Sequence, residues 1–264
     1  MAGPSAPGLG AGSVRRMEGL HLIEHRPLRP GAPLVVLVHG SLDRAASFSR
    51  VGRRLRDLDV VVYDRRGYHR SRSAAPRAAG FDDHVADLLA VIGDRRAAVV
   101  GHSLGGDVAL AAAIAAPQAI TAVGAYEPPL PWMAWWPRRN RTIDTDDPAG
   151  FAEAFFRRVV GDQAWERLPE RTRAERRAEG PTLLAEISAL RMDAAPFDLA
   201  ALAVPLVVGR GERSLAHHRR AIDALVELRP DAEVVEISGA AHGAHLSHPD
   251  AFAAFVRQTV AARR

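Results

Sequence analysis

Short apolar runs recur along the chain, bounded by turn residues and separated by stretches with helical spacing. Their β-branched content and short length are typical of strands that are buried on both faces of a parallel sheet. We predict an α/β fold with a mostly parallel central sheet and helices on both faces. The strands are expected at 34–38, 60–63, 97–100, 119–125, 206–208 and 234–237, with an antiparallel edge strand at 19–25. The helices are expected at 46–58, 81–92, 104–116, 217–228 and 249–262.

The alternation of strands and helices stops between Pro128 and Pro196, where the sequence becomes helical, rich in arginine and aromatic. We predict that residues 129–196 form a helical lid inserted into a core made of 19–128 and 197–264, preceded by a mobile tail at 1–18. Trp132, Trp135 and Trp136 of this insertion either line an apolar substrate pocket or pin the lid to the main body.

Composition excludes several classes of protein. The length of 264 residues suits one domain, and 47% hydrophobic with 25% charged residues is ordinary for a globular chain. All 35 basic residues are arginine, yet the net charge is only +4 and no basic stripe carries stacking aromatics, so we predict no nucleic-acid partner. The chain has no cysteine for disulfides or thiolate metal sites. No apolar run reaches the roughly 20 residues that span a membrane, and a cytoplasmic location is the default expectation.

The segment GHSLGG at 101–106 comes directly after a predicted strand and directly before a predicted helix. In this context, G-x-S-x-G is typical of a tight turn that raises the serine hydroxyl above the sheet edge. Gly101 and Gly105 suit so sharp a turn, because a side chain at either position would collide with neighbouring backbone. Ser103 is therefore the predicted nucleophile, and the alternative is a simple N-cap of the helix.

Four further segments, together with this motif, resemble the α/β-hydrolase family from about Leu34 to Phe255. LVVLVHGS at 34–41 resembles the family's third strand and oxyanion loop, and YDRRGYHRS at 63–71 its strand-4 turn. PLVVGRGE at 205–212 resembles the strand that delivers the acid, and GAAHGAHLSHP at 239–249 the loop that carries the histidine. One departure is His69, where the family normally has a small residue. The resemblance implies a hydrolase that needs no cofactor.

His242 is the predicted base. A serine nucleophile needs a base to remove its proton, and His242 follows a strand on a short Gly and Ala loop and matches the family's histidine position. His245 and His248 follow at intervals of three residues, so a metal cluster is an alternative. The segment has no carboxylate or cysteine to complete such a cluster, and we predict no metal. We expect His245 to support the loop and His248 to cap the final helix.

Two carboxylates compete for the role of the acid that orients His242. Glu212 lies just past the predicted strand at 206–208, where the resemblance places the acid, and is preferred. Glu127, after the strand at 119–125, is the alternative, because some members of the family place the acid there. The chain order Ser, acid, His is that of the family.

The backbone N–H groups of Ser41 and Leu104 are the predicted oxyanion donors, with Leu42 as the substitute for Ser41. The resulting hypothesis is a serine hydrolase that cleaves an ester or related acyl bond of a small, largely apolar molecule, with His102 and the three neighbouring tryptophans as candidate pocket residues. Lactone opening, carbon–carbon bond hydrolysis and perhydrolysis reuse the same site and stay open. From another class, a member of the fold that only binds a ligand also stays open.

Overall fold

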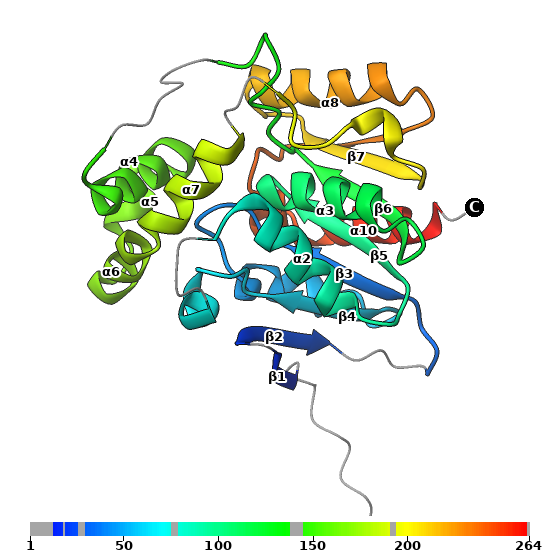
Figure 1. Ribbon diagram of the computed structural model, residues 1–264, viewed down its shortest axis with the longest axis horizontal. Coiled ribbons are helices and arrows are strands. Elements are labelled where there is room, and N and C mark those ends of the chain that lie inside the picture. Colours follow the sequence, from blue (N-terminus) through cyan, green and yellow to red (C-terminus); the bar gives the residue numbers. More distant parts are fainter. Residues whose placement is uncertain are drawn as a thin grey trace, which may run out of the picture.

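The computed structural model describes residues 13–17, 19–25, 30–74, 79–137, 145–190 and 194–262. Eight strands within these ranges form one sheet in the order β1-β2-β4-β3-β5-β6-β7-β8 (Figure 1). β3 to β8 run parallel, and β2 is antiparallel to both of its neighbours, β1 and β4. Their bounds are β1 (Ser13–Met17), β2 (Leu20–His25), β3 (Leu34–Val38), β4 (Asp59–Tyr63), β5 (Ala97–His102), β6 (Ile120–Tyr126), β7 (Leu206–Gly211) and β8 (Glu233–Ile237).

The predicted fold class and all the predicted strands are confirmed, with ends that shift by up to three residues. β2 is antiparallel as expected, but it is not the edge strand, because β1 pairs along its outer side. The prediction of a tail over 1–18 was wrong for Ser13–Met17, which form β1. Four of the five side chains of β1 are exposed, so the strand leaves no pattern of burial in the sequence. Residues 1–12 and 18 lie outside the described part.

Helices cover both faces of the sheet, and each face has its own apolar core. On one face α2 (Phe81–Ile92), α3 (Leu104–Ala115) and α8 (Ala216–Leu228) pack against residues such as Val36 and Val99. On the other face α1 (Ser49–Gly52) and α10 (Pro249–Ala261) pack against residues such as Val35 and Val100. The helix expected at 46–58 is shorter, and consists of the 3-10 helix η1 (Ala45–Phe48), α1 and turns. The other short elements are η2 (His69–Ala74), η3 (Leu199–Ala201) and α9 (Ala244–Ser247).

Among the described residues between β6 and β7, four α-helices form a separate group beside the sheet (Figure 1). They are α4 (Pro148–Val160), α5 (Asp162–Glu166), α6 (Glu170–Ala178) and α7 (Gly180–Leu190), and we call residues 145–190 the insertion. Its apolar side chains build a small core of their own, in which Trp165 is fully buried against Phe156 and Leu183. That core also includes Leu42 and Tyr68 of the main body, so the insertion is packed onto the loops after β3 and β4.

The strand order changes direction between β3 and β5, since the chain proceeds to β4 on one side and to β6 on the other. In open parallel sheets, ligands bind at such a switch point, outside the carboxyl ends of the strands. Ser41 follows β3 and Ser103 follows β5, so both candidate residues lie at this point. The fold alone therefore brings the predicted nucleophile to the place where a small molecule can bind.

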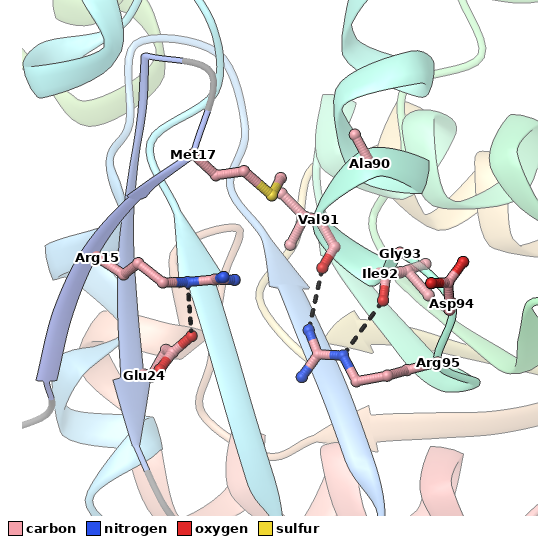
Figure 2. A pocket seen from close by; sticks show the side chains of 9 residues that line it. All are labelled: Arg15, Met17, Glu24, Ala90, Val91, Ile92, Gly93, Asp94 and Arg95. Atoms are coloured by element: carbon pink, nitrogen blue, oxygen red, sulfur yellow. Dashed lines mark hydrogen bonds and ion pairs between the residues drawn. The ribbon is translucent and has the colours of Figure 1, made fainter.

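A pocket of about 450 Å³ lies on the β1 side of the sheet, between β1, β2 and the end of α2 (Figure 2). Arg15 and Glu24 form an ion pair of 3.2 Å on one side, and Arg95 donates to the carbonyls of Val91 and Ile92 on the other. None of the lining residues belongs to the loops at the switch point. In the described part of the chain, no helix has both the length and the apolar composition that a membrane crossing requires.

Asp107 is an unusual member of the core. It is fully buried in the first turns of α3, and neither carboxyl oxygen has a hydrogen-bond partner among the described residues. Burial raises the pKa of Asp107 well above its usual value, since no nearby cation offsets the loss of water. The folded protein therefore holds this proton more tightly than the unfolded chain does.

This difference predicts a specific dependence of stability on pH. A carboxyl whose pKa is higher in the folded protein than in the unfolded chain contributes stability that is fully present below the unfolded-state pKa. This stability is lost as the pH rises through the folded-state pKa. Asp107→Asn imitates the protonated form, so it should match the wild type near pH 4 and exceed its free energy of unfolding by about 1–3 kcal/mol near pH 8. Urea unfolding at a series of pH values measures the difference, and a difference independent of pH would contradict the assignment.

Candidate active site

Ser103 lies on a strained turn between β5 and α3. Its backbone has φ 53° and ψ −131°, a conformation rarely adopted by a residue other than glycine. A Cβ on Gly101 would overlap the carbonyl of Gly105, and a Cβ on Gly105 would overlap the carbonyl of Val38. The side chain of Ser103 is half-buried, and its Oγ has no hydrogen-bond partner among the described residues. The turn therefore presents a free hydroxyl above the sheet.

Glu127, and not Glu212, holds the ring of His242. Nδ1 of His242 lies 2.8 Å from Oε2 of Glu127, a side chain with no exposed surface. Oε1 of Glu127 accepts hydrogen bonds from the Gly211 N–H at 2.8 Å and from the Ser214 hydroxyl. Because a carboxylate only accepts, Nδ1 of His242 carries the proton and Nε2 carries the lone pair.

Glu212 is placed elsewhere, although the resemblance favoured it. Its carboxylate accepts from the Ser238 hydroxyl at 2.8 Å and from the Gly239 N–H at 2.6 Å, and the residue is exposed. These two donors lower the pKa of Glu212. The sequence-based preference was wrong about which carboxylate reaches His242, because β6 and β7 end side by side and either strand can present an acid there.

Two further imidazoles flank the ring of His242. His218 stacks on it with centroids 4.3 Å apart and an interplanar angle of 15°, and the ring of His102 lies 4.6 Å away on a tilt of 47°. Burial and the neighbouring His242 lower the pKa of His218 to about 2, and burial likewise lowers the pKa of His102 well below its usual value. Both flanking rings are therefore neutral. The sequence reasoning missed His218, although the His217–His218 pair just after the strand at 206–208 was a usable signal.

His102 connects the turn of Ser103 to the loop of His242. Its Nε2 lies 2.8 Å from the carbonyl oxygen of His242, so Nε2 donates and Nδ1 carries the lone pair. The Tyr126 hydroxyl donates to the carbonyl of Ala241 in the same loop at 3.1 Å. Because Ser103 follows His102 directly in the chain, the loop of His242 is bonded to the residue that precedes the predicted nucleophile. His102 was expected as a pocket residue, but its buried ring has this internal contact instead.

The loop after β3, residues 39–44, lies against the turn of Ser103 and is called the β3 loop. A Cβ on Gly40 would lie 2.9 Å from Cβ of Ser103, so only glycine permits this approach. The carbonyl of Gly40 faces inward, where it accepts from Arg65 at 3.1 Å and from Nδ1 of His39 at 2.7 Å. The peptide bond between Gly40 and Ser41 is trans, as are all those of the described residues, so the N–H of Ser41 points the opposite way, outward.

Leu104 begins α3, where the first N–H groups have no partner inside the helix. The two predicted oxyanion donors, Ser41 and Leu104, thus come from the two loops that flank the switch point. Leu42 has φ 51°, and its side chain is buried in the core of the insertion.

The tryptophans expected near the site have different surroundings. Trp132 packs edge-on against Phe197 at 5.4 Å, and Trp135 lies against Trp136 at 5.8 Å. Trp136 also contacts the ring of His218 at 6.1 Å, which makes it the tryptophan connected by ring contacts to His242. All three tryptophans pack against the main core, as expected if they pin this segment to the main body.

Within the described ranges, two groups of side chains have possible ligand atoms within 4.8 Å of one another, the spacing of metal ligands. In the first, Glu127 with His218 and His242, the two rings are nearly parallel, so their lone pairs do not converge on one point. In the second, Nε2 of His245 lies 3.2 Å from Oδ2 of Asp43, which ties the histidine loop to the β3 loop beside His102. His248 bonds to Ser247 and belongs to neither group. The three histidines of the loop therefore do not form a common cluster.

Comparisons with known proteins identify the family of the chain. A family model described as "Alpha/beta hydrolase family" matches residues 35–255. RutD from Cronobacter sakazakii, named as a candidate carbamate hydrolase, is 34% identical over 139 residues, which cover 47% of this chain and 50% of RutD. The chain spans about half the length of the first curated relatives that it matches.

Solved structures resemble the chain over nearly its whole length. The enol-lactonase from Burkholderia xenovorans has a TM-score of 0.68 at 24% identity, covering 94% of this chain and 100% of that one. A hydrolase from Pseudomonas aeruginosa has a TM-score of 0.70 at 22% identity, covering 95% and 99%. At these identities the likeness concerns the fold alone.

Proposed function

The chain belongs to the alpha/beta hydrolase family, and from that premise we propose that it is a serine hydrolase acting on a small, largely apolar acyl compound. Ser103 is the proposed nucleophile, His242 the base and Glu127 the acid. The observation that carries the proposal is the contact of 2.8 Å between Nδ1 of His242 and the buried carboxylate of Glu127, on a loop bonded to the residue before Ser103.

The proposed reaction follows from the protonation states. With Nδ1 donating to Glu127, Nε2 of His242 is available to take the proton of Ser103 as Oγ attacks the substrate carbonyl. The imidazolium then returns this proton to the leaving oxygen, which leaves an acyl group on Ser103. A water molecule attacks the acyl-enzyme in the second half, with His242 again as base, and Ser103 is released.

The oxyanion of each tetrahedral intermediate needs fixed donors. We assign this role to the N–H groups of Leu104 and Ser41, which are supported by the position of Leu104 at the helix start and by the inward carbonyl of Gly40. The rings of Trp136 and His218 offer an apolar wall beside His242 for the substrate.

The first test is the reactivity of Ser103. The wild type should release nitrophenol from short acyl esters and react with a fluorophosphonate, whereas Ser103→Ala should lose both, with turnover lower by at least about a thousandfold. Ser247→Ala, an exposed serine in the histidine loop, is the matched control and should keep both activities. A panel of esters, lactones, thioesters and carbamates then identifies the acyl class. Equal labelling of wild type and Ser103→Ala would defeat the proposal.

The second test separates the two candidate acids. Glu127→Gln keeps the shape of the side chain but cannot orient His242 as a carboxylate does, so kcat should fall by about a hundredfold to ten-thousandfold. Glu212→Gln changes a carboxylate on the neighbouring strand end and should leave kcat within about threefold. Steady-state kinetics on one nitrophenyl ester provides the comparison. A larger loss in the Glu212 variant than in the Glu127 variant would reverse the assignment.

A further inference from the structure

Helix α7 of the insertion sends one charged side chain into the main body. The carboxylate of Glu186 has no exposed surface, and it lies between groups from three different segments. It pairs with Arg65 and accepts from the Tyr68 hydroxyl at 2.7 Å and from the Ser41 hydroxyl at 2.9 Å. Nε2 of His84 lies 2.8 Å from its other side. The catalytic steps proposed above use none of these contacts.

The charge of Glu186 is kept in this buried place by its partners. Burial alone would raise the pKa of Glu186, but Arg65 and His84 lower it to about 2. A buried ion pair gives little net stability compared with well-packed apolar side chains, because both charges lose their water. What the contacts of Glu186 do fix is direction, since both of its carboxylate oxygens are bonded to groups of the main body.

Arg65 transmits the position of Glu186 to the β3 loop. Its Nε donates to the carbonyl of His39 at 2.9 Å, and its Nη2 donates to the carbonyl of Gly40 at 3.1 Å. The guanidinium is planar, so these bonds and the bond to Glu186 are fixed relative to one another. The inward carbonyl of Gly40 is what points the N–H of Ser41 outward. The direction of a proposed oxyanion donor therefore depends on Arg65.

The insertion holds the same region at two further points. Arg176 of α6 donates to the carbonyl of Leu42, whose side chain lies in the core of the insertion. Glu179 accepts from the N–H of His69 at 2.9 Å, which fixes the residue that departs from the family pattern in a left-handed conformation with φ 41°. The insertion is thus hydrogen-bonded to the loops after β3 and β4, and Glu186 contributes a fully buried contact to the same region.

We propose, on the basis of the proposed function, that Glu186 is a positioning residue for the reaction at Ser103. It acts through Arg65 and Ser41 and holds the β3 loop so that the Ser41 N–H faces the reacting carbonyl. The insertion is in this view a wall of the oxyanion site, and its displacement would disable catalysis even with Ser103, His242 and Glu127 in place.

Glu186→Gln tests the proposal in the full-length protein. The amide keeps the volume of the side chain, but it removes the charge that fixes Arg65. We expect kcat on a nitrophenyl ester to fall about tenfold to a hundredfold, because displaced oxyanion donors stabilise the transition state less. KM should change less than threefold. The measured rate is divided by the amount of Ser103 that fluorophosphonate has labelled when labelling is complete. This gives the rate per active site and removes the effect of misfolded protein.

Glu153→Gln is the matched control. Glu153 pairs with Arg157 and Arg177 in the same insertion, at a half-exposed position without contact to the β3 loop. The kcat of this variant should stay within about twofold of the wild type. That result would show that loss of an ion pair in the insertion is not in itself sufficient to lower kcat. If Glu186→Gln does not fold, Ser41→Ala replaces it, since this variant removes only the hydroxyl bond to Glu186, and its kcat should fall about threefold to tenfold.

The outcomes separate this inference from the one on which it rests. A wild-type protein without Ser103-dependent labelling or turnover would refute the proposed function itself. An active wild type with an unchanged kcat per labelled serine in Glu186→Gln, or in Ser41→Ala where that variant is used, would overturn the positioning role. A reduced melting temperature with normal kcat would give Glu186 a purely structural role and would also overturn it.

Discussion

The turn at Ser103 is possible only because three backbone segments approach each other without side chains between them. Gly101 and Gly105 leave room within the turn and against β3, and Gly40 leaves room for the β3 loop beside Cβ of Ser103. This close approach has a consequence beyond the turn. It places the β3 loop directly against the turn of Ser103, at the ends of two paired strands. The order of the strands, which reverses between these two, then provides the opening above them.

The two candidate acids show that chain order and strand topology carry different information. Glu127 and Glu212 both precede His242 in the sequence, and both follow strands that end at the same side of the sheet. Chain order therefore allows either residue. The distinction lies in local backbone: Glu127 has φ 46° and its N–H donates to the carbonyl of Gly209, which turns its side chain under the loop of His242. The N–H of Gly211 then occupies its second oxygen. The spacing of residues along the sequence does not predict these hydrogen bonds.

The sheet and its helices could be predicted from the sequence because burial on two faces leaves a strong pattern of apolar residues. The exposed strand β1 could not, since four of its five side chains face water. Glu186 was missed for the opposite reason, because it is a charged residue that is buried. A glutamate in a predicted helix ordinarily belongs to the solvated face, and only the fold reveals that Arg65 and His84 meet it in the interior. Ser103 and His242 could be singled out from the sequence because both lie in glycine-containing loops next to buried strands.

The imidazole rings of His102 and His218 both contact that of His242, and only one of the three can be the proposed base. A charged His102 or His218 would lie within 5 Å of His242 and would oppose its protonation. Burial removes this conflict, because it lowers the pKa of both flanking rings and keeps them neutral. Their polar atoms are used differently: Nε2 of His102 fixes the loop of His242, whereas His218 offers its ring face. His242 alone among the three has a carboxylate on its Nδ1. Neutral neighbours and one buried carboxylate therefore distinguish His242 from the other two rings as the proposed base.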